Sequence, residues 1–156
     1  MIGKSFRGQL VIMVGIPASG KSTWIRENCA EGWTWISPDA ILEERYHYEW
    51  TPERAAEAWA ESFQAYGAVL LSGGKVVWDA TFVSPIIRAS VLHIAKGVGF
   101  ATTAVFMDAD LETCIARNLE RDREPVPENT IRRMHESLIP PSEEEGFDQV
   151  ILLRPF

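Results

Sequence analysis

Short apolar runs alternate with longer amphipathic stretches along the chain. Five runs have the length of a strand, namely 10–14, 33–37, 75–78, 102–107 and 149–153. Every residue from 10 to 14 is apolar, which is typical of a central parallel strand buried on both faces. The stretches between the runs predict helices, which are expected over 22–31, from Pro38, over 51–72, 85–96 and 110–121, and from Pro127.

Three of these helices begin with the same pattern, a capping hydroxyl followed by proline at the first helical position. The three pairs are Ser37-Pro38, Thr51-Pro52 and Ser84-Pro85. The helix over 51–72 carries an apolar stripe at helical spacing, made of Trp59, Phe63, Tyr66 and Leu70. Packing in the core is the favoured interpretation of this stripe, and a platform for stacking nucleic-acid bases is the alternative.

The alternation of strands and helices predicts an α/β fold with three layers. We expect a five-stranded parallel sheet with helices on both faces, formed by a single domain over 1–156. Ligands of such sheets bind beyond the carboxyl ends of the strands. Acidic residues follow three of the predicted strands at this edge, namely Asp39, Asp79 and Asp108. The sequence therefore predicts one shared cleft.

The first strand leads into Gly15-x-x-x-x-Gly20-Lys21-Ser22, which is the full P-loop (Walker A) pattern. Glycines let successive backbone N–H groups point at phosphate oxygens, and the following helix N-terminus favours negative charge. Lys21 can reach the β- and γ-phosphates, and the Ser22 hydroxyl can ligate Mg²⁺. The pattern predicts a site for ATP or another nucleoside triphosphate with Mg²⁺, formed by Gly15, Ala18, Ser19, Gly20, Lys21, Ser22 and Thr23.

Bulk properties limit the partners and the compartment. The net charge of −7 argues against a protein that coats nucleic acid nonspecifically, although a local basic pocket remains compatible with it. No apolar run is long enough to span a membrane, and residues 1–8 lack the apolar segment of a secretory signal. Cys29 and Cys114 have no metal-binding spacing, so we expect reduced core thiols in a cytoplasmic protein.

Three arginines supply the cations that phosphoryl transfer needs. Arg117 and Arg121 are four residues apart on a predicted helix, and Arg123 lies in the charged loop that follows. We expect residues 117–127 to form a lid that closes over the nucleotide and excludes water. A solvated, salt-bridged surface is the alternative interpretation of this segment.

Asp39 is the predicted general base, because it lies at a helix start near the expected acceptor hydroxyl. Its alternative role is stabilisation of the helix end. Asp79 competes with it, as a carboxylate that binds Mg²⁺ or the acceptor. Aromatic residues flank Asp39 and are candidates for stacking on an acceptor base, namely Trp33, Trp35, Tyr46, Tyr48 and Trp50.

With these residues considered, nearly the whole chain resembles the P-loop kinases of the phage polynucleotide-kinase type. The likeness rests on the Walker A segment, on Ser37-Pro38-Asp39, on Asp79-Ala80-Thr81, and on two later blocks, 117–127 and 141–147. It implies transfer of the γ-phosphate of ATP to a 5′-hydroxyl end of DNA or RNA, in the cytosol of a phage-infected or bacterial cell. By this likeness, Asp39 is the base, Lys21 and Ser22 are the P-loop pair, and Arg117 and Arg121 contact the donor phosphates.

Two departures from the family pattern concern the acceptor. Leu42 occupies the position of an arginine that holds the acceptor's phosphate in the family, and Phe82 occupies a position that tends to be asparagine. Arg45 is a candidate substitute for the missing arginine. The residues predicted to bind the acceptor are therefore Asp39, Asp79, Thr81 and Arg45.

Other functions remain open at this point. A related phage-type kinase phosphorylates a hydroxymethyl group on a pyrimidine in DNA, which requires that base to be flipped out of the helix. A small-molecule or nucleoside kinase is a further alternative that the acidic net charge favours. An ATPase switch module without any acceptor is the alternative outside the transferases.

Overall fold

The structure, a computed structural model, describes residues 5–156. The prediction that residues 1–8 contain no secretory signal lies partly outside the described residues. The elements are β1 (Gly8–Val14), α1 (Lys21–Asn28), β2 (Trp33–Ile36), α2 (Pro38–Tyr46), α3 (Pro52–Ser72), β3 (Lys75–Trp78), α4 (Pro85–Gly97), β4 (Phe100–Met107), α5 (Leu111–Leu119), α6 (Glu128–Ser137), the 3₁₀ turn η1 (Glu143–Glu145) and β5 (Gln149–Leu153).

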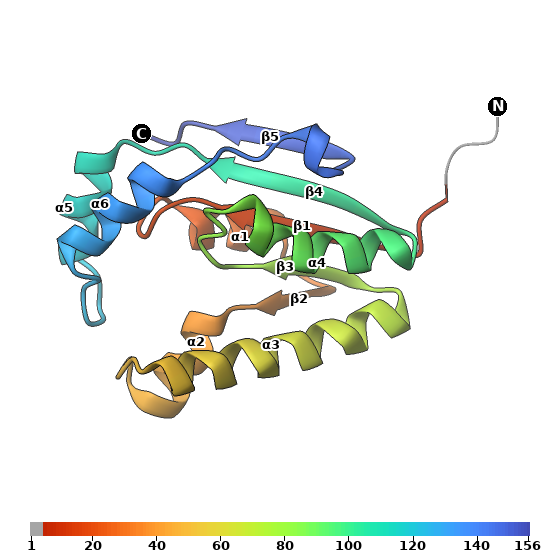
Figure 1. The fold of residues 1–156 in the computed structure, drawn as a ribbon, viewed down its shortest axis with the longest axis horizontal. Helices are drawn as coiled ribbons and strands as arrows, with labels where there is room; N and C mark the ends of the chain where they lie inside the picture. Colours follow the sequence, from red (N-terminus) through yellow and green to blue (C-terminus); the bar gives the residue numbers. More distant parts are fainter. Residues whose placement is uncertain (1–4) are drawn as a thin grey trace.

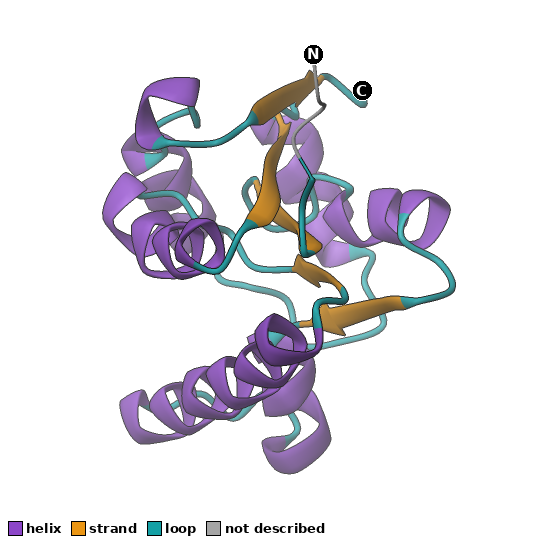
Figure 2. Ribbon diagram, turned by 90° about the vertical axis from the view of Figure 1, so that its right-hand side faces the viewer, coloured by secondary structure: helices purple, strands orange, loops and turns teal. Residues whose placement is uncertain are grey.

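All five strands run parallel, in the spatial order β2-β3-β1-β4-β5 (Figure 1). Helices lie on both sides of this sheet (Figure 2). The predicted three-layer α/β architecture is therefore confirmed. Because β1 is central and its neighbours are β3 and β4, the segments that follow these strands lie beside the segment that follows β1.

Alternate residues of β1 enter two different cores. Leu10, Ile12 and Val14 pack with residues of α3 and α4, while Val11 and Met13 pack with α1 on the opposite face. This double burial explains why the strand is apolar at every position from 10 to 14. A third cluster joins α5 and α6 to the start of the P-loop.

The aromatic stripe of α3 belongs to the core. The rings of Trp59, Phe63 and Tyr66 surround Trp78 of β3, at centroid distances of 5.5, 5.2 and 5.4 Å. Phe82 closes the group from the loop after β3, at 5.9 Å from Trp78. This arrangement confirms core packing, so the stripe is not a surface on which bases stack.

The three capped helix starts form as predicted. A hydroxyl oxygen of Ser37, Thr51 or Ser84 accepts a backbone N–H of the first turn in each case, at 3.1 to 3.2 Å. These bonds satisfy N–H groups that have no partner within the helix.

The end of α5 differs from the prediction. The helix stops at Leu119, so Arg121 lies in the following loop and does not share a helix face with Arg117. The side-chain amide of Asn118 explains the early stop, because it bonds both backbone groups of Val126, at 2.7 and 3.1 Å. This pair of bonds closes residues 119–126 into a compact loop.

Two further predictions from the sequence concern the cysteines and the absence of a membrane-spanning helix. Cys29 and Cys114 are buried free thiols, in agreement with their assignment to the core. None of the helices within residues 5–156 combines the length and the apolar character that crossing a membrane requires.

Candidate active site

The P-loop connects β1 to α1 and has a tightly curled backbone. Ala18 and Gly20 adopt left-handed conformations, with φ of 64° and 98°. A side chain at Gly15 would collide with the Ser19 hydroxyl, which lies 2.6 Å from the position of its Cβ. The Gly15 N–H donates to the carbonyl of Thr81 at 3.1 Å. The loop is thereby fixed to the segment that follows β3.

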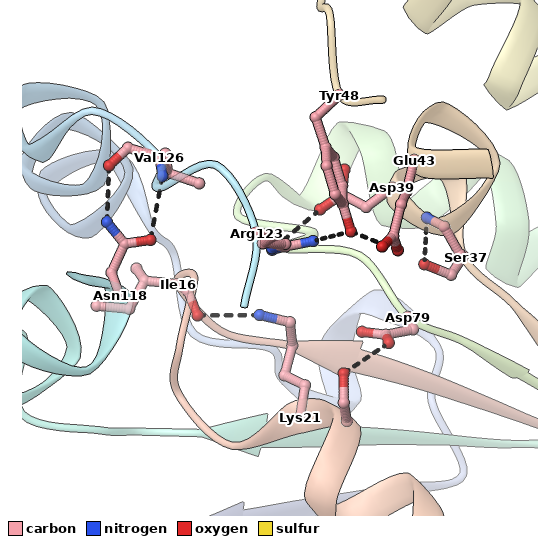
Figure 3. A network of polar contacts seen from close by, with 12 residues as sticks. Ile16, Lys21, Ser37, Asp39, Glu43, Tyr48, Asp79, Asn118, Arg123 and Val126 are labelled. Carbon is pink, nitrogen blue, oxygen red and sulfur yellow. Dashed lines mark hydrogen bonds and ion pairs between the residues drawn. The ribbon is translucent and has the colours of Figure 1, made fainter. Parts of the chain in front are cut away.

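Lys21 is buried at the first position of α1. Its ammonium donates to the carbonyls of Gly15 and Ile16, both at 2.9 Å. Figure 3 shows the bond to Ile16. Burial lowers the pKa of Lys21, while the nearby carboxylates of Asp79 and Asp39 act in the opposite direction. The side chain is therefore a desolvated cation held on two neutral acceptors, and a phosphate group is a stronger partner for it.

Asp79 lies at the end of β3, directly beside α1. Its Oδ2 accepts hydrogen bonds from the Ser22 hydroxyl at 3.2 Å and from the Trp35 indole at 3.1 Å. Mg²⁺ takes oxygen ligands and is usually held by one or two carboxylates together with substrate phosphates. The pair of Ser22 and Asp79 fits that donor set.

The protein supplies too few ligands for a metal that binds by itself. Residues 5–156 contain no group of three or more histidine, cysteine, aspartate or glutamate side chains that could hold an ion. A magnesium ion at Ser22 and Asp79 would therefore depend on nucleotide phosphates for its remaining ligands.

A cleft of about 920 Å³ opens above the P-loop. It unites residues from α1, α2, the loop after β3 and the segment from α5 onward. The predicted site residues that line it are Ala18, Ser19, Gly20, Lys21, Ser22, Thr23, Asp39, Asp79, Thr81, Arg117, Arg121 and Arg123. Gly15 does not line the cleft, but its carbonyl oxygen accepts a hydrogen bond from the Lys21 ammonium.

Arg45 is the predicted site residue that the structure places elsewhere. It projects from α2 to α3 and pairs with Glu61 at 2.6 Å. Its side chain is not among those that line the cleft. Arg45 therefore does not replace the arginine missing at Leu42, which is itself buried.

Several side-chain donors in the cleft have no protein partner. The Ser19 hydroxyl and the Nη1 of Arg121 are buried and form no hydrogen bond with any described residue. Burial lowers the pKa of Arg121, and the charge of Arg123 adds to this effect. Unpaired buried donors beside a P-loop are suited to an anion, so these atoms fit the polyphosphate of a nucleotide.

Arg117 lies at the edge of this donor group. Its guanidinium stacks on the ring of Phe156, at 4.3 Å from the centroid. Phe156 also approaches Gly20 of the P-loop, within 3.9 Å of the position that a Cβ there would occupy. The chain after β5 therefore supports Arg117, a contact that nothing in the sequence pattern indicates.

The opposite side of the cleft is acidic. We call it the α2 wall, and it consists of Ser37, Asp39, Glu43, Glu44 and Tyr48. Asp39 lies in the first turn of α2 with 67% of its side chain exposed. Its carboxylate faces the space in front of Lys21 (Figure 3). The glutamates of the wall were not predicted as site residues, because charged residues of a short helix are usually solvent-facing.

Arg123 lies against the α2 wall, close enough to Arg121 for their charges to interact. Its Nη1 donates to the Tyr48 hydroxyl at 3.1 Å, and its guanidinium lies 4.9 Å from the centre of that ring. Its Nη2 is 3.9 Å from Asp39 (Figure 3). The Tyr48 hydroxyl donates in turn to Glu43 at 2.7 Å. From the sequence, Arg123 was predicted to bind the donor phosphates together with Arg117 and Arg121. In the structure its contacts are with Tyr48 and Asp39 of the α2 wall.

Two of the five aromatic residues that flank Asp39 line the cleft, namely Trp35 and Tyr48. His47 and Tyr48 adopt successive left-handed conformations, with φ of 50° and 63°. This turn ends α2 and returns the Tyr48 ring to the cleft. The other three aromatic candidates lie outside it, and Tyr46 instead bonds Glu57 of α3.

A buried ion pair supports the loop that carries Asp79 and Thr81. Arg88 is completely buried and donates through Nε and Nη2 to both carboxylate oxygens of Glu145, at 2.8 and 2.9 Å. Its Nη1 donates to the carbonyl of Phe82 at 2.6 Å. Phe82 has a φ of 45°, and its ring enters the aromatic core. The side chain at this departure from the family pattern therefore packs in the core and does not line the cleft.

Comparisons with known proteins identify the family of the chain. The profile of the AAA_33 family, an AAA domain, matches residues 10–141. L-seryl-tRNA(Sec) kinase of Mus musculus is 33% identical over 71 residues, which are 46% of this chain and 20% of that protein. The chain thus spans about a fifth of the length of this relative.

Solved structures share the fold over most of the chain. A candidate kinase from Chloroflexus aurantiacus J-10-fl aligns with a TM-score of 0.75 and 19% identity, over 96% of this chain and 86% of that one. A chain of the Pnkp1/Rnl/Hen1 RNA repair complex aligns with a TM-score of 0.73 and 22% identity, over 87% and 45%. The chain therefore belongs to the AAA_33 family and has the fold of a P-loop kinase.

Proposed function

We propose that the chain is a kinase that transfers the γ-phosphate of ATP, or of another nucleoside triphosphate, to a hydroxyl group. One observation carries the proposal. A single cleft holds a P-loop with a desolvated lysine and unpaired donors, and across from them it holds the accessible carboxylate of Asp39. These are the parts that phosphoryl transfer to an alcohol requires.

On the donor side, the chain binds and neutralises the polyphosphate. The P-loop amides, the Ser19 hydroxyl and Lys21 surround its oxygens, and Arg117 and Arg121 approach from the lid. Bound Mg²⁺ would supply charge neutralisation at the phosphates, held by Ser22 and Asp79. Preorganised cations in a site that excludes water stabilise the charge of the transition state without reorganisation.

On the acceptor side, Asp39 is the proposed general base. It accepts the proton of the acceptor hydroxyl as that oxygen forms its bond to the γ-phosphorus. The bond from the γ-phosphorus to the bridging oxygen breaks, and the nucleoside diphosphate leaves. Asp39 suits this role better than Asp79, whose Oδ2 already accepts bonds from Ser22 and Trp35.

For the acceptor, we propose a hydroxyl of a nucleic acid, in the first instance a 5′-hydroxyl end. Two proteins that are similar to this chain are named for RNA substrates or RNA repair, namely the seryl-tRNA kinase and the Pnkp1 complex. Trp35 and Tyr48 offer aromatic surfaces at the cleft for a base. A hydroxymethyl group on a flipped pyrimidine would use the same surfaces.

A small-molecule hydroxyl is the second candidate, and the charge of the α2 wall favours it. Asp39, Glu43 and Glu44 place three carboxylates where the acceptor enters. Such a wall disfavours a polyanion and accepts a neutral or cationic alcohol more readily.

Transfer of label from γ-labelled ATP in the presence of Mg²⁺ tests the proposal. The acceptors are 5′-hydroxyl oligonucleotides, hydroxymethyluracil-containing DNA, nucleosides and small polyols. The proposal predicts labelled product with 5′-hydroxyl oligonucleotides. Label on hydroxymethyluracil or on a polyol alone would reassign the acceptor. ATP hydrolysis without label on any acceptor would identify an ATPase module and overturn the kinase proposal.

A further inference from the structure

We propose that Arg123 binds a phosphate group of the acceptor, beside the hydroxyl that Asp39 activates. The inference rests on the proposed function and specifies it further. It assigns to the α2 wall an acceptor with a phosphate next to its reactive hydroxyl, as in a nucleotide that carries a 3′-phosphate. It also replaces the role predicted from the sequence, in which Arg123 binds the phosphates of the nucleotide.

The position of Arg123 is the first observation. Its side chain is 19% exposed, and the Nη2 lies 3.9 Å from the Asp39 carboxylate. The residue comes from the loop after α5, yet its contacts are with Tyr48 and Asp39 of the α2 wall. A phosphate bound by this guanidinium would therefore lie next to the proposed base.

The unused donors of Arg123 are the second observation. Nη1 is occupied by the Tyr48 hydroxyl. Nε is buried and has no hydrogen-bond partner within residues 5–156, and the 3.9 Å from Nη2 to Asp39 exceeds a hydrogen bond. Nε and Nη2 form the edge through which Arg88 binds both oxygens of Glu145. The same edge of Arg123 makes no hydrogen bond within residues 5–156, and its geometry suits an oxyanion.

The charge balance of the cleft is the third observation. The other cations that line it are Lys21, Arg117 and Arg121, which belong to the P-loop and to the segment above it. The charge of Asp39 also acts on Lys21 and Arg121. Among the described residues, Arg123 is the cation that forms an ion pair with a carboxylate of the α2 wall. Leu42 is uncharged and buried, and Arg45 is paired with Glu61. Neither residue therefore offers a positive charge to the acceptor.

Tyr48 is the residue that positions Arg123. Its ring lies under the guanidinium, and its hydroxyl accepts from Nη1 while donating to Glu43. The bond to Glu43 fixes the direction of the hydroxyl. The arginine is therefore held with Nη1 on Tyr48 and with Nη2 toward Asp39.

Two acceptors that differ by one phosphate test the inference. Thymidine and thymidine 3′-monophosphate both present a 5′-hydroxyl, and KM and kcat are measured for each and for ATP. We expect Arg123→Ala to raise KM for thymidine 3′-monophosphate by roughly 10- to 100-fold, the effect of one lost charge-assisted contact. The KM values for thymidine and ATP should stay within about threefold. Arg133→Ala, an exposed arginine on α6, is the matched control.

Tyr48→Phe separates positioning from binding. This variant keeps the ring but removes the hydroxyl that holds Nη1. We expect a smaller rise in KM, again confined to the acceptor with a phosphate. An equal rise for thymidine and thymidine 3′-monophosphate would show that Tyr48 contacts the nucleoside itself and would contradict the positioning role.

Three results would overturn the inference. They are an increase of KM for ATP with both acceptors, an equal loss for both acceptors, and no change in any constant. Calorimetric titration of thymidine 3′-monophosphate into wild type and Arg123→Ala, with a non-hydrolysable ATP analogue present, needs no turnover. If wild type transfers no label, the kinase proposal fails, while a difference in this titration still supports the phosphate site. Equal titration of both proteins overturns it.

Discussion

Buried donors without partners are the most informative side-chain feature of the cleft. Leaving such a group unsatisfied costs about 1–3 kcal/mol, and the cleft contains the Ser19 hydroxyl, the Arg121 Nη1 and the Arg123 Nε in this condition. Lys21 is paired only with neutral carbonyls. Anionic ligands would satisfy all four side chains, the nucleotide at Ser19, Lys21 and Arg121 and the acceptor at Arg123. This cost to the free protein would then become binding energy.

The lowered pKa of Lys21 predicts a pH dependence of nucleotide binding. Phosphates bind the ammonium form, and burial shifts the loss of its proton to a pH below that of an ordinary lysine. Affinity for ATP should be constant at lower pH and fall by up to about tenfold per unit once the pH exceeds this lowered pKa. Calorimetric titration between pH 7.5 and 10 measures the effect.

The matching control is Lys21→Met, which removes the titrating group. This variant should bind ATP more weakly and lose the dependence on pH. A wild-type affinity that stays constant up to pH 10 would contradict the assignment of Lys21 to the phosphates.

Arg121→Ala should reduce the rate of transfer. Loss of one preorganised donor to the transition state costs about 3 kcal/mol, which corresponds to a kcat lower by two orders of magnitude. Because Nη1 has no partner within residues 5–156, the free protein should lose little stability. Steady-state kinetics and a thermal melt check both statements. An unchanged kcat would contradict a contribution of Arg121 to the transition state.

The location of side chains was predictable from sequence where the spacing of one motif defines the cleft. The P-loop residues, Asp39 and Asp79 all line or support the cleft as expected. The contacts of Arg45 and Arg123 were not predictable, because their partners, Glu61 and Tyr48, come from other segments. Helical spacing says nothing about such contacts.

Among the secondary-structure elements, the loop from β3 to α4 depends most on distant support. It carries Asp79 and Thr81, and it includes Phe82 in a left-handed conformation that is unfavourable for a large side chain. Arg88 stabilises this conformation by its bond to the Phe82 carbonyl and by its pair with Glu145. The turn η1 thus supports the active-site loop from outside the cleft.

Arg88→Met should destabilise the protein by about 3–5 kcal/mol, because it leaves the carboxylate of Glu145 partly buried without its partner. The double variant with Glu145→Met should recover much of this loss, since an apolar pair replaces the charges. Urea unfolding measures both. Arg132→Ala removes an exposed pair with Glu112 and Glu128 and should cost no more than about 1 kcal/mol. Equal effects of Arg88→Met and Arg132→Ala would contradict the supporting role.

Helix starts were predictable because the capping hydroxyl and the proline are adjacent in sequence. The end of α5 was not, because it depends on Asn118 reaching Val126 across a loop. Arg88 was also missed. It occupies the buried stripe of α4 with Val91, Leu92 and Ala95, and a lone arginine in an apolar stripe is the signal that identifies such a buried pair.

The strand order explains how the whole chain forms one site. Because β3 lies between β2 and β1, Asp79 emerges beside the P-loop and Asp39 emerges one strand farther along the same edge. The alternating pattern predicted a parallel sheet but not this order, which long-range pairing determines. The distance of one strand separates Asp79, the proposed magnesium ligand, from Asp39, the proposed base.

Both cysteines should be unreactive in the folded protein. Burial raises the pKa of the Cys114 thiol to about 11 and also raises that of Cys29, so little thiolate forms at pH 8. A disulfide reagent such as DTNB should label neither thiol rapidly in buffer and both in urea. Fast labelling of either one in buffer would contradict its burial in the core.

Comparison of Asp39→Asn with wild type tests the proposed chemistry most directly. The amide keeps the size of the side chain but accepts no proton, so transfer of label from γ-labelled ATP to the acceptor should fall by about 10²- to 10⁴-fold. Affinity for ATP, measured on the same samples, should be nearly unchanged, because the donor phosphates lie at the P-loop. Transfer at the wild-type rate would contradict the assignment of Asp39 as the base.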